Sequence, residues 1–150
     1  MKIEKAHIDD HEILSEIAFK GKGYWNYGEE QLESWRDNLT ISKDYIKENK
    51  VYKLVELDKT IGFYSLILID KSTIKIDFLF MFPEFIGKGV GKFLLENCIE
   101  TAKKMNIKRI ILDADPNAEA FYKHFGFVTY EKMESSIKNR FLPQMELIIS

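Results

Sequence analysis

The strongest constraint on the fold is a change in the spacing of apolar residues near the middle of the chain. From Val51 to Phe82, apolar and polar side chains alternate in runs rich in β-branched and aromatic residues, which is the pattern of β-strands. After Pro83, apolar residues recur every three or four positions from Val90 to Met105, which predicts a helix of about four turns. The chain must therefore combine sheet and helix in a mixed α/β fold.

The order of the elements predicts how the sheet is connected. The strands before Pro83 are split by short polar turns, so we expect an antiparallel meander. A compact apolar run follows the long helix, and because that helix separates it from the meander, the two neighbouring strands can run parallel as a βαβ unit. The expected strands are Lys2–His7, Val51–Leu57, Ile61–Ile69, Thr73–Phe82, Arg109–Asp113, Phe127–Met133 and Gln144–Ile149. The further helices expected are one on Ile13–Ala18 ending near Gly21 and Gly23, one within Tyr24–Leu39 after an aromatic loop, one from Ser42 to Glu48, and one that Asp115 caps and Gly126 ends.

Composition excludes several classes of protein. A chain of 150 residues without repeats or linkers is expected to form one domain, 1–150. With 22 basic and 24 acidic residues the net charge is −2, so no general attraction to nucleic acid or to an anionic membrane is expected. The longest apolar run, Phe78–Phe82, is too short to cross a bilayer. Cys98 is the only cysteine and the N-terminus lacks the apolar core of a signal peptide, which favours a cytoplasmic protein.

A glycine-rich turn lies where the strands give way to the long helix, and it reads Ile86-Gly87-Lys88-Gly89-Val90-Gly91-Lys92. Alternating glycines allow backbone N–H groups to face one point, and the helix start adds about half a positive charge, so a pyrophosphate fits this turn. A Walker loop would need glycine at Ile86 and a hydroxyl at Phe93, and the dinucleotide fingerprint would need glycine at Lys92 or Leu94. The turn therefore predicts a pyrophosphate site of another kind, with a plain glycine-rich turn or a nucleotide-binding domain as alternatives.

Two blocks of the sequence resemble the GNAT superfamily of N-acetyltransferases. The acetyl-CoA loop of that family, Gln/Arg-x-x-Gly-x-Gly/Ala, aligns with Ile86, Gly89 and Gly91, and Asp115–Phe127 is similar to its asparagine, tyrosine and glycine-phenylalanine block. The resemblance implies a central, mostly antiparallel sheet with one parallel splayed strand pair, flanked by helices, and acetyl-CoA as the cosubstrate. The residues that it places at the cofactor are Phe80, Met81, Phe82, Ile86, Gly87, Lys88, Gly89, Val90, Gly91, Lys92, Asn117, Phe121 and Tyr122.

The sequence departs from the family pattern at Ile86, where a basic or amide side chain is usual. The backbone amides, Lys88 and Lys92 must therefore carry more of the anion binding, so we expect binding that is more sensitive to salt. The last segment, Ser135–Met145, also resembles a bacterial subgroup of the family whose acceptor is unassigned.

The predicted chemistry needs a base and a proton donor. The acceptor amine must be neutral to react, and Asp77 is the first candidate for the base, followed by an acidic cluster. Tyr122 falls at the family's usual tyrosine position and can donate a hydrogen bond or a proton to the departing thiolate. The acidic cluster consists of Glu29, Glu30 and Glu33.

The acceptor pocket is expected in the aromatic region before the sheet, where the resemblance places it. Trp25 and Tyr27 are the candidates to hold an amine by cation–π contacts, whereas Trp35 is expected in the core. The histidines show no ligand spacing, so no metal is expected. The function predicted is transfer of the acetyl group from acetyl-CoA to a primary amine of a small molecule or peptide. The transfer is expected to be direct, in a ternary complex, and a homodimer is one expected form of the protein. Cys98 lies on the apolar helix stripe, which disfavours an acetyl-cysteine route; a non-catalytic acyl-CoA-sensing module is the alternative.

Overall fold

The computed structural model describes residues 1–137 and 139–149. These residues form a seven-stranded sheet in the order β1-β2-β3-β4-β5-β7-β6. The strands are β1 (Lys2–Lys5), β2 (Lys50–Glu56), β3 (Lys59–Leu68), β4 (Thr73–Met81), β5 (Arg109–Asp113), β6 (Val128–Glu134) and β7 (Phe141–Ile148). The helices are α1 (His11–Gly23), α2 (Glu29–Ser34), α3 (Lys43–Glu48), α4 (Val90–Lys104) and α5 (Glu119–His124), with 3₁₀ turns at Ile8–Asp10, Asp37–Leu39, Pro83–Phe85 and Pro116–Ala118.

The pairing of the strands confirms the predicted mixed sheet. β4 and β5 run parallel, with Thr73 opposite Arg109, and they are joined through α4 as the βαβ pattern requires. The β1–β2, β2–β3, β5–β7 and β6–β7 pairs are antiparallel. The chain divides into two compact units, Met1–Leu66 with Phe78–Cys98, and Ile67–Asp77 with Ile99–Ser150, which are described separately below. The expectation of a single domain stays a prediction.

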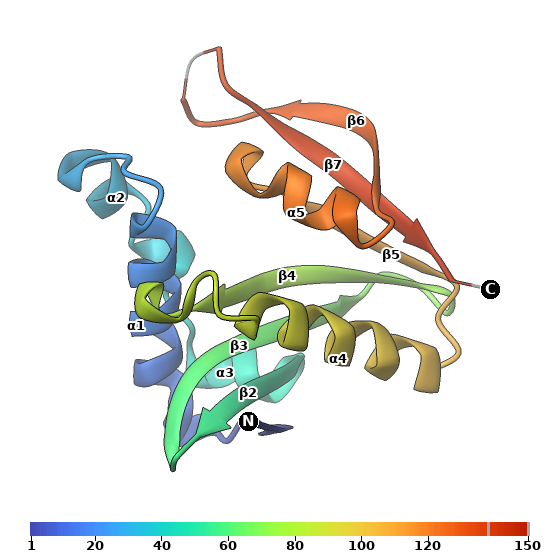
Figure 1. Ribbon diagram of the computed structural model, residues 1–150, viewed down its shortest axis with the longest axis horizontal. Coiled ribbons are helices and arrows are strands. Elements are labelled where there is room, and N and C mark those ends of the chain that lie inside the picture. The colour runs from blue at the N-terminus through green and yellow to red at the C-terminus, as the bar shows by residue number, and fades with distance from the viewer. Residues whose placement is uncertain (138, 150) are drawn as a thin grey trace. The chain divides into compact units, whose positions relative to one another are not determined.

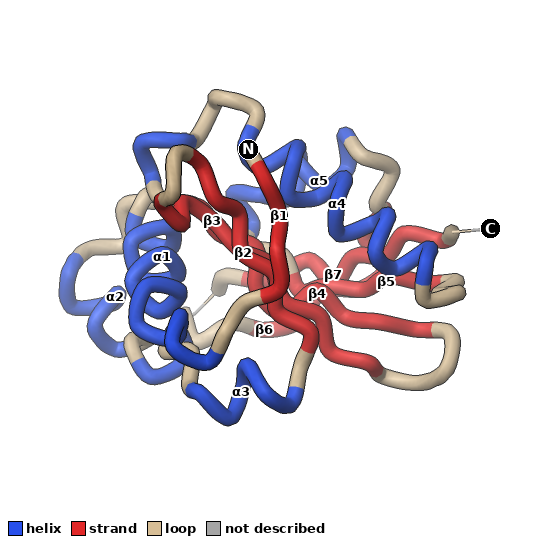
Figure 2. Tube along the Cα trace, turned by 90° about the horizontal axis from the view of Figure 1, so that it is seen from below, coloured by secondary structure: helices blue, strands red, loops and turns tan. Residues whose placement is uncertain are grey.

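The first unit has a layer of helix on each face of its strands. Figures 1 and 2 show α3 on one face of β2 and β3 and the first half of α4 on the other. On the α3 side, buried side chains of α1, α3, β2 and β3 form one cluster with Phe78, Phe80 and Phe82 packed against it. On the other side α4 lies very close to the strands. A Cβ atom at Gly62 would lie only 3.2 Å from the Leu94 side chain, so the absence of a side chain at Gly62 permits this approach.

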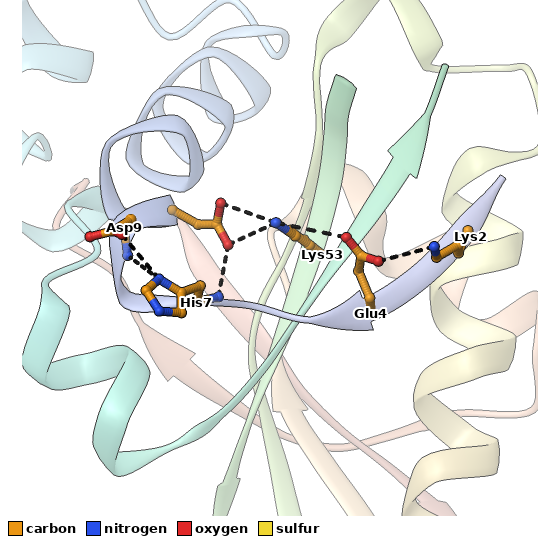
Figure 3. Close-up of polar contacts among 6 residues, drawn as sticks. Lys2, Glu4, His7, Asp9 and Lys53 are labelled. Carbon is orange, nitrogen blue, oxygen red and sulfur yellow. Dashed lines mark hydrogen bonds and ion pairs between the residues drawn. The ribbon is translucent and has the colours of Figure 1, made fainter. Parts of the chain in front are cut away.

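Polar contacts fix the start of the chain to β2, as Figure 3 shows. The Lys53 ammonium group lies 3.0 Å from the Asp10 carboxylate and 3.8 Å from that of Glu4. The same Asp10 carboxylate accepts the His7 backbone N–H at 2.8 Å, while the His7 ring accepts the Asp9 N–H. This network caps the 3₁₀ turn that leads into α1, so α1 starts at a defined position beside β1.

The second unit is built around β5, which lies between β4 and β7. Ile110 and Leu112 of β5 are buried together with Met145 of β7 and Phe127, and α5 lies over one face of these strands (Figure 1). Across the β5–β7 pair, the Arg109 guanidinium group bonds the Glu146 carboxylate at 2.6 Å, which raises the pKa of Arg109 further above its usual range. The two strands are therefore joined by side chains as well as by the backbone ladder.

Beyond small shifts at element ends, the structure differs from the expected elements in three places. The helix expected between the Asp115 cap and Gly126 begins as the 3₁₀ turn Pro116–Ala118 and continues as α5. The helix expected within Tyr24–Leu39 is shorter, because Gly28 adopts a φ of 88° before α2 and the chain tightens into a 3₁₀ turn at Asp37–Leu39. The last strand begins at Phe141, three positions before Gln144, and it includes Pro143. The Pro143 carbonyl accepts the Ala114 N–H at 2.9 Å. Proline has no N–H to donate, but its carbonyl still bonds the neighbouring segment, so it is compatible with this strand.

Candidate functional site

The glycine-rich turn leads from β4 into α4, and we call Ile86–Lys92 the phosphate loop. Gly87 and Gly89 have φ values of 83° and 82°, a region that residues with a Cβ atom rarely adopt. A Cβ atom at either position would meet nothing within 4 Å, so open space lies beside both glycines. Glycine is thus favoured at both positions by the positive φ of the backbone and not by neighbouring atoms that a side chain would meet. No side chain fills the space beside these two residues.

The start of α4 leaves backbone donors without helical acceptors. The first bond into the helix runs from the Phe93 N–H to the Gly89 carbonyl at 3.1 Å, so the N–H groups of Val90, Gly91 and Lys92 precede the helical ladder. α4 has 15 residues, long enough for the dipole at its N-terminus to favour an anion. Gly91 belongs to this first helical turn and does not share the positive φ of the other two glycines.

The side chains of the phosphate loop add charge at its surface. Lys88 and Lys92 are exposed, whereas Ile86 is half-buried and contributes no polar atom. The Lys88 N–H is already bonded to the Phe85 carbonyl at 3.3 Å, which closes the turn. The loop therefore presents exposed ammonium groups beside a set of backbone amides, an arrangement suited to a phosphate.

β4 and the residue after it, shortly before this loop, carry three residues predicted to bind the cofactor, Phe80, Met81 and Phe82. Phe80 and Phe82 pack their rings against the core of the first unit. The Phe82 N–H donates to the Ile61 carbonyl at 2.9 Å, so this group is engaged by β3. Because main-chain groups alternate in direction along a strand, those of Met81 point away from β3. Of the three residues, Met81 has the main chain best placed to bind a ligand.

In the second unit, the segment after β5 is organised by one carboxylate, and we call Asp115–Phe127 the tyrosine block. One Asp115 oxygen accepts the Asn117 N–H at 2.9 Å and the Asn117 side-chain amide at 3.0 Å. The other oxygen accepts from Arg140 at 3.3 Å, and both side chains of that ion pair are largely buried. Asn117 is exposed, and its predicted contact with a cofactor would add to this capping role.

Tyr122 is held by the aromatic residues of the tyrosine block. Its side chain is buried, with only 8% of its surface exposed, and its ring meets those of Phe121 at 5.2 Å and Phe127 at 5.6 Å in edge-on contacts. α5 ends at His124. Gly126 follows with a φ of 95°, which allows the chain to turn back so that the Phe127 N–H bonds the Tyr122 carbonyl. The tyrosine thus sits on a short helix whose two ends are both fixed.

The candidate bases differ in their surroundings. Asp77 is half-buried in β4 and belongs to the second unit. Glu33 accepts two bonds from the Arg36 guanidinium group, at 2.8 and 2.6 Å, and this hydrogen bonding lowers the pKa of Glu33. A carboxylate with a lowered pKa is a weaker base, so Glu33 is a poorer candidate for the base than Glu29 and Glu30. Glu29 and Glu30 line a depression of the first unit.

The aromatic residues before the sheet form two separate pairs. Trp25 meets Tyr24, and Tyr27 meets Trp35, each edge-on at 4.9 Å between ring centroids. The Lys22 ammonium group lies 5.3 Å from the Tyr27 ring and 5.1 Å from that of Trp35, within the range of cation–π attraction. Trp35 is half-buried, and it packs against the core of the first unit as expected while Lys22 lies beside its ring. The depression beside this pair measures about 520 Å³ and is lined by Tyr27, Gly28, Glu29, Glu30, Gln31 and Ser34.

The only cysteine is packed inside α4. Cys98 has no exposed surface, and burial raises the pKa of its thiol well above the usual range. In the part of the chain that the structure describes, no group of three or more His, Cys, Asp or Glu side chains is arranged to hold a metal ion. Within the same residues, no helix is both long and apolar enough to cross a bilayer.

One polar pair with a fully buried serine was not singled out from the sequence. Ser65 has no exposed surface in β3, and its hydroxyl lies 2.8 Å from the Tyr45 hydroxyl and accepts the Phe78 N–H at 3.1 Å. The available signal was a serine inside the apolar run Ile61–Leu66, because a polar residue in a fully buried strand must find partners.

The sequence matches the family model described as the acetyltransferase (GNAT) domain over residues 24–147. A curated relative, the uncharacterized N-acetyltransferase ycf52 of Gracilaria tenuistipitata var. liui, is 45% identical over 47 residues, which are 31% of this chain and 26% of that protein. The chain thus spans about a quarter of the length of the curated relatives it matches.

Solved structures match over nearly the whole chain. The PaiA N-acetyltransferase of Thermoplasma acidophilum, solved in complex with coenzyme A, superimposes with a TM-score of 0.81 at 26% identity, over 99% of this chain and 100% of that one. A GCN5-related N-acetyltransferase of Rhodopseudomonas palustris gives a TM-score of 0.79 at 19% identity, over 99% and 95% of the two chains, and shows the shared fold.

The family model covers most of the chain, and the fold agrees with it. The chain therefore belongs to the GNAT acetyltransferase family, a family of acyltransferases.

Proposed function

We propose that this protein transfers the acetyl group of acetyl-CoA directly to a primary amine. The observation that carries the proposal is the phosphate loop, where two glycines with positive φ open onto free space at the start of a 15-residue helix in a chain of this family. The complex of the Thermoplasma relative with coenzyme A supports the same cofactor for this chain.

Binding of acetyl-CoA is proposed to begin with its pyrophosphate. The N–H groups of Gly89 to Lys92 donate to the phosphate oxygens, and the α4 dipole together with Lys88 and Lys92 balances their charge. Farther along the cofactor, the Met81 main chain bonds the pantetheine arm, with Asn117 and Phe121 as further contacts. Because Ile86 supplies no polar group, the backbone provides most of the directional contacts in the loop.

The acceptor amine must lose a proton before it attacks. With a pKa near 10.4, a lysine-like amine lies about 3.4 units from neutrality at pH 7, which costs about 4.6 kcal/mol. Asp77 is proposed as the base that accepts this proton, either directly or through water. The neutral nitrogen then attacks the thioester carbonyl, the new C–N bond forms, and the C–S bond breaks to release coenzyme A.

Tyr122 is proposed to assist the departing thiolate. On ordinary pKa values of about 10 for tyrosine and 8.5 for a thiol, complete proton transfer is uphill by about 2 kcal/mol, which a hydrogen bond in the transition state can offset. Its rigid packing between Phe121 and Phe127 suits this role, because a fixed donor needs no reorganisation during the reaction.

The acceptor is proposed to bind through its positive charge near Trp25 and Tyr27. The contacts of the Lys22 ammonium group with the Tyr27 and Trp35 rings support this proposal, because they are of the kind that a primary ammonium ion of the acceptor would make. Glu29 and Glu30 line the adjoining depression and add negative charge. A cationic small molecule or a basic peptide end fits this chemistry.

Two measurements test the proposed function. Isothermal titration should show binding of acetyl-CoA that weakens as salt is raised, and thiol release from acetyl-CoA should appear with some members of a panel of primary amines. Absence of binding even at low salt would contradict the cofactor assignment. Binding without thiol release across the panel would favour an acyl-CoA-sensing module, and a rise in melting temperature with ATP or NAD but not coenzyme A would favour a nucleotide-binding domain.

A further inference from the structure

One face of β3 meets α4 at two points within the first unit. A Cβ atom at Gly62 would lie 3.2 Å from the Leu94 side chain, and the Tyr64 hydroxyl donates to the Asn97 side-chain oxygen at 2.6 Å. Alternate residues share a face of a strand, and residues three apart share a face of a helix. The two contacts therefore join a single face of β3 to a single face of α4.

The bond between Tyr64 and Asn97 is a polar contact in an apolar surrounding. Tyr64 has no exposed surface and Asn97 is half-buried, and the Tyr64 ring stacks on that of Tyr52 at 5.2 Å between centroids. Apolar packing has no preferred direction, whereas a hydrogen bond depends on both distance and angle. This bond therefore selects one position of α4 against β3. The buried side chains of α4 in the first unit are Val90, Leu94, Leu95 and Cys98.

The same helix begins with the N–H groups proposed to bind the pyrophosphate. Asn97 lies seven residues after Val90, the first residue of α4, which is about 10 Å along the helix axis. The continuous ladder of a helix carries a slide or a rotation at Asn97 to the amides at its start. Binding groups have to be held within about 0.5 Å of their productive positions. A contact two turns away can therefore control how well the phosphate loop fits its ligand.

We propose that Tyr64 is a positioning residue, which fixes α4 through Asn97 and thereby sets the place of the phosphate-loop amides. The inference rests on the proposed function, in which those amides bind the pyrophosphate of acetyl-CoA. Phenylalanine would fill almost the same space as Tyr64, so the hydroxyl contributes direction and little volume. A polar pair among apolar residues adds little net stability, because both partners lose water on folding, but it can specify one register.

The first test compares Tyr64→Phe with a control on the other face of β3. The Tyr45 hydroxyl lies 2.8 Å from that of Ser65, so Tyr45→Phe removes a hydroxyl contact between α3 and β3 that does not involve α4. We expect Tyr64→Phe to raise the Kd for acetyl-CoA about fivefold, an effect similar to the loss of one hydrogen bond. Tyr45→Phe should lower the melting temperature but change that Kd less than about twofold.

A double variant separates position from stability. Tyr64→Phe combined with Asn97→Ala removes both partners, and alanine is a better helix former than asparagine, so the melting temperature should return close to that of the unmodified protein. The Kd for acetyl-CoA should stay raised about fivefold, because α4 still lacks its directional contact. S-acetylpantetheine, which has no pyrophosphate, provides a second measurement. Its Kd, measured by titration, should change less than about twofold in every variant.

The outcomes separate this inference from the proposed function. Affinity that recovers together with the melting temperature in the double variant would overturn the positioning role. Equal losses of affinity for acetyl-CoA and S-acetylpantetheine would overturn it as well. If the unmodified protein binds no acetyl-CoA, the proposed function fails, and hydrogen exchange then decides.

Exchange of the Phe93 amide reports the start of α4 without any ligand. This amide bonds the Gly89 carbonyl at 3.1 Å and closes the first turn of the helix. It should exchange at least about threefold faster in the double variant than in the unmodified protein, although the two melt at similar temperatures. Tyr45→Phe should leave this exchange unchanged. Equal protection of the Phe93 amide in the double variant and the unmodified protein would overturn the inference.

Discussion

The phosphate loop and the tyrosine block offer different kinds of atoms to the ligands proposed for them. The loop offers main-chain N–H groups, and its two positive-φ glycines have open space beside them. The tyrosine block offers side chains, and a largely buried ion pair, a cap and edge-on ring contacts hold them in place. One region depends on backbone conformation, whereas the other depends on packing.

This contrast separates binding from chemistry. An anion held by amides is bound almost equally well before and during the reaction, so the loop should govern affinity. The proposed donor, Tyr122, would interact with the negative charge on the sulfur only as the C–S bond breaks, so it should govern turnover. The four predictions below test this separation, and each names a result that would break it.

The largest effect is expected at Tyr122. Tyr122→Phe keeps the ring contacts with Phe121 and Phe127 and removes the proposed donor, so kcat should fall about 100-fold, the lower end for a general acid, while the Kd for acetyl-CoA changes less than twofold. Steady-state kinetics and titration measure the two quantities. Tyr130→Phe is the matched control, because it removes a hydroxyl from an exposed tyrosine of β6 and should leave kcat unchanged. Unchanged kcat in Tyr122→Phe would remove chemistry from the tyrosine block.

The next effect is expected in the phosphate loop. Gly89→Ala must either hold a strained φ near 82° or relax and misplace the amides, at a cost of about 1 to 2 kcal/mol, so the Kd for acetyl-CoA should rise about tenfold. At saturating acetyl-CoA, kcat should be nearly unchanged. Gly28→Ala carries the same kind of strain, with a φ of 88° and nothing within 4 Å, but it lies before α2. It should lower stability without changing the Kd, and an equal loss of affinity in both variants would contradict a specific role for the loop.

The sequence predicted the phosphate loop better than the tyrosine block. Glycines at alternate positions between a strand and a helix constrain the backbone locally, so both the turn and the start of α4 could be placed from the sequence alone. The β4–β5 parallel pair also followed, because a helix has to connect parallel neighbours. These are properties of short segments, and a sequence displays them directly.

Contacts between distant segments could not be predicted in the same way. Arg140 bonds Asp115 across 25 positions, and nothing near either residue indicates the partner. Trp35 matched the helical apolar spacing, yet its pairing with Tyr27 and Lys22 depends on the loop between them.

A smaller effect is expected from the charges around the loop. Lys88→Gln and Lys92→Gln should each raise the Kd for acetyl-CoA about threefold at low salt, and the effect should shrink as added ions screen exposed charges. Ile86→Arg should act in the opposite direction, because it supplies the bidentate phosphate contact that this loop lacks. Titration at two salt concentrations measures all three. Lys47→Gln, at an exposed position of α3, controls for net charge, and a similar shift there would show that the lysines act only through the overall field.

The smallest effect is expected at Cys98, although this residue could break the whole comparison. An acetyl-cysteine route would place the chemistry in α4, but the Cys98 thiol is fully buried and its pKa is raised by that burial, so the nucleophilic thiolate is disfavoured at neutral pH. Cys98→Ala should therefore keep kcat within about twofold, with a modest fall in melting temperature from the lost packing. In the unmodified protein, an alkylating reagent should react with this thiol far more slowly than with the same protein unfolded in urea. A folded Cys98→Ala variant without turnover would move the reaction from the tyrosine block to α4, and binding and chemistry would then depend on the same helix.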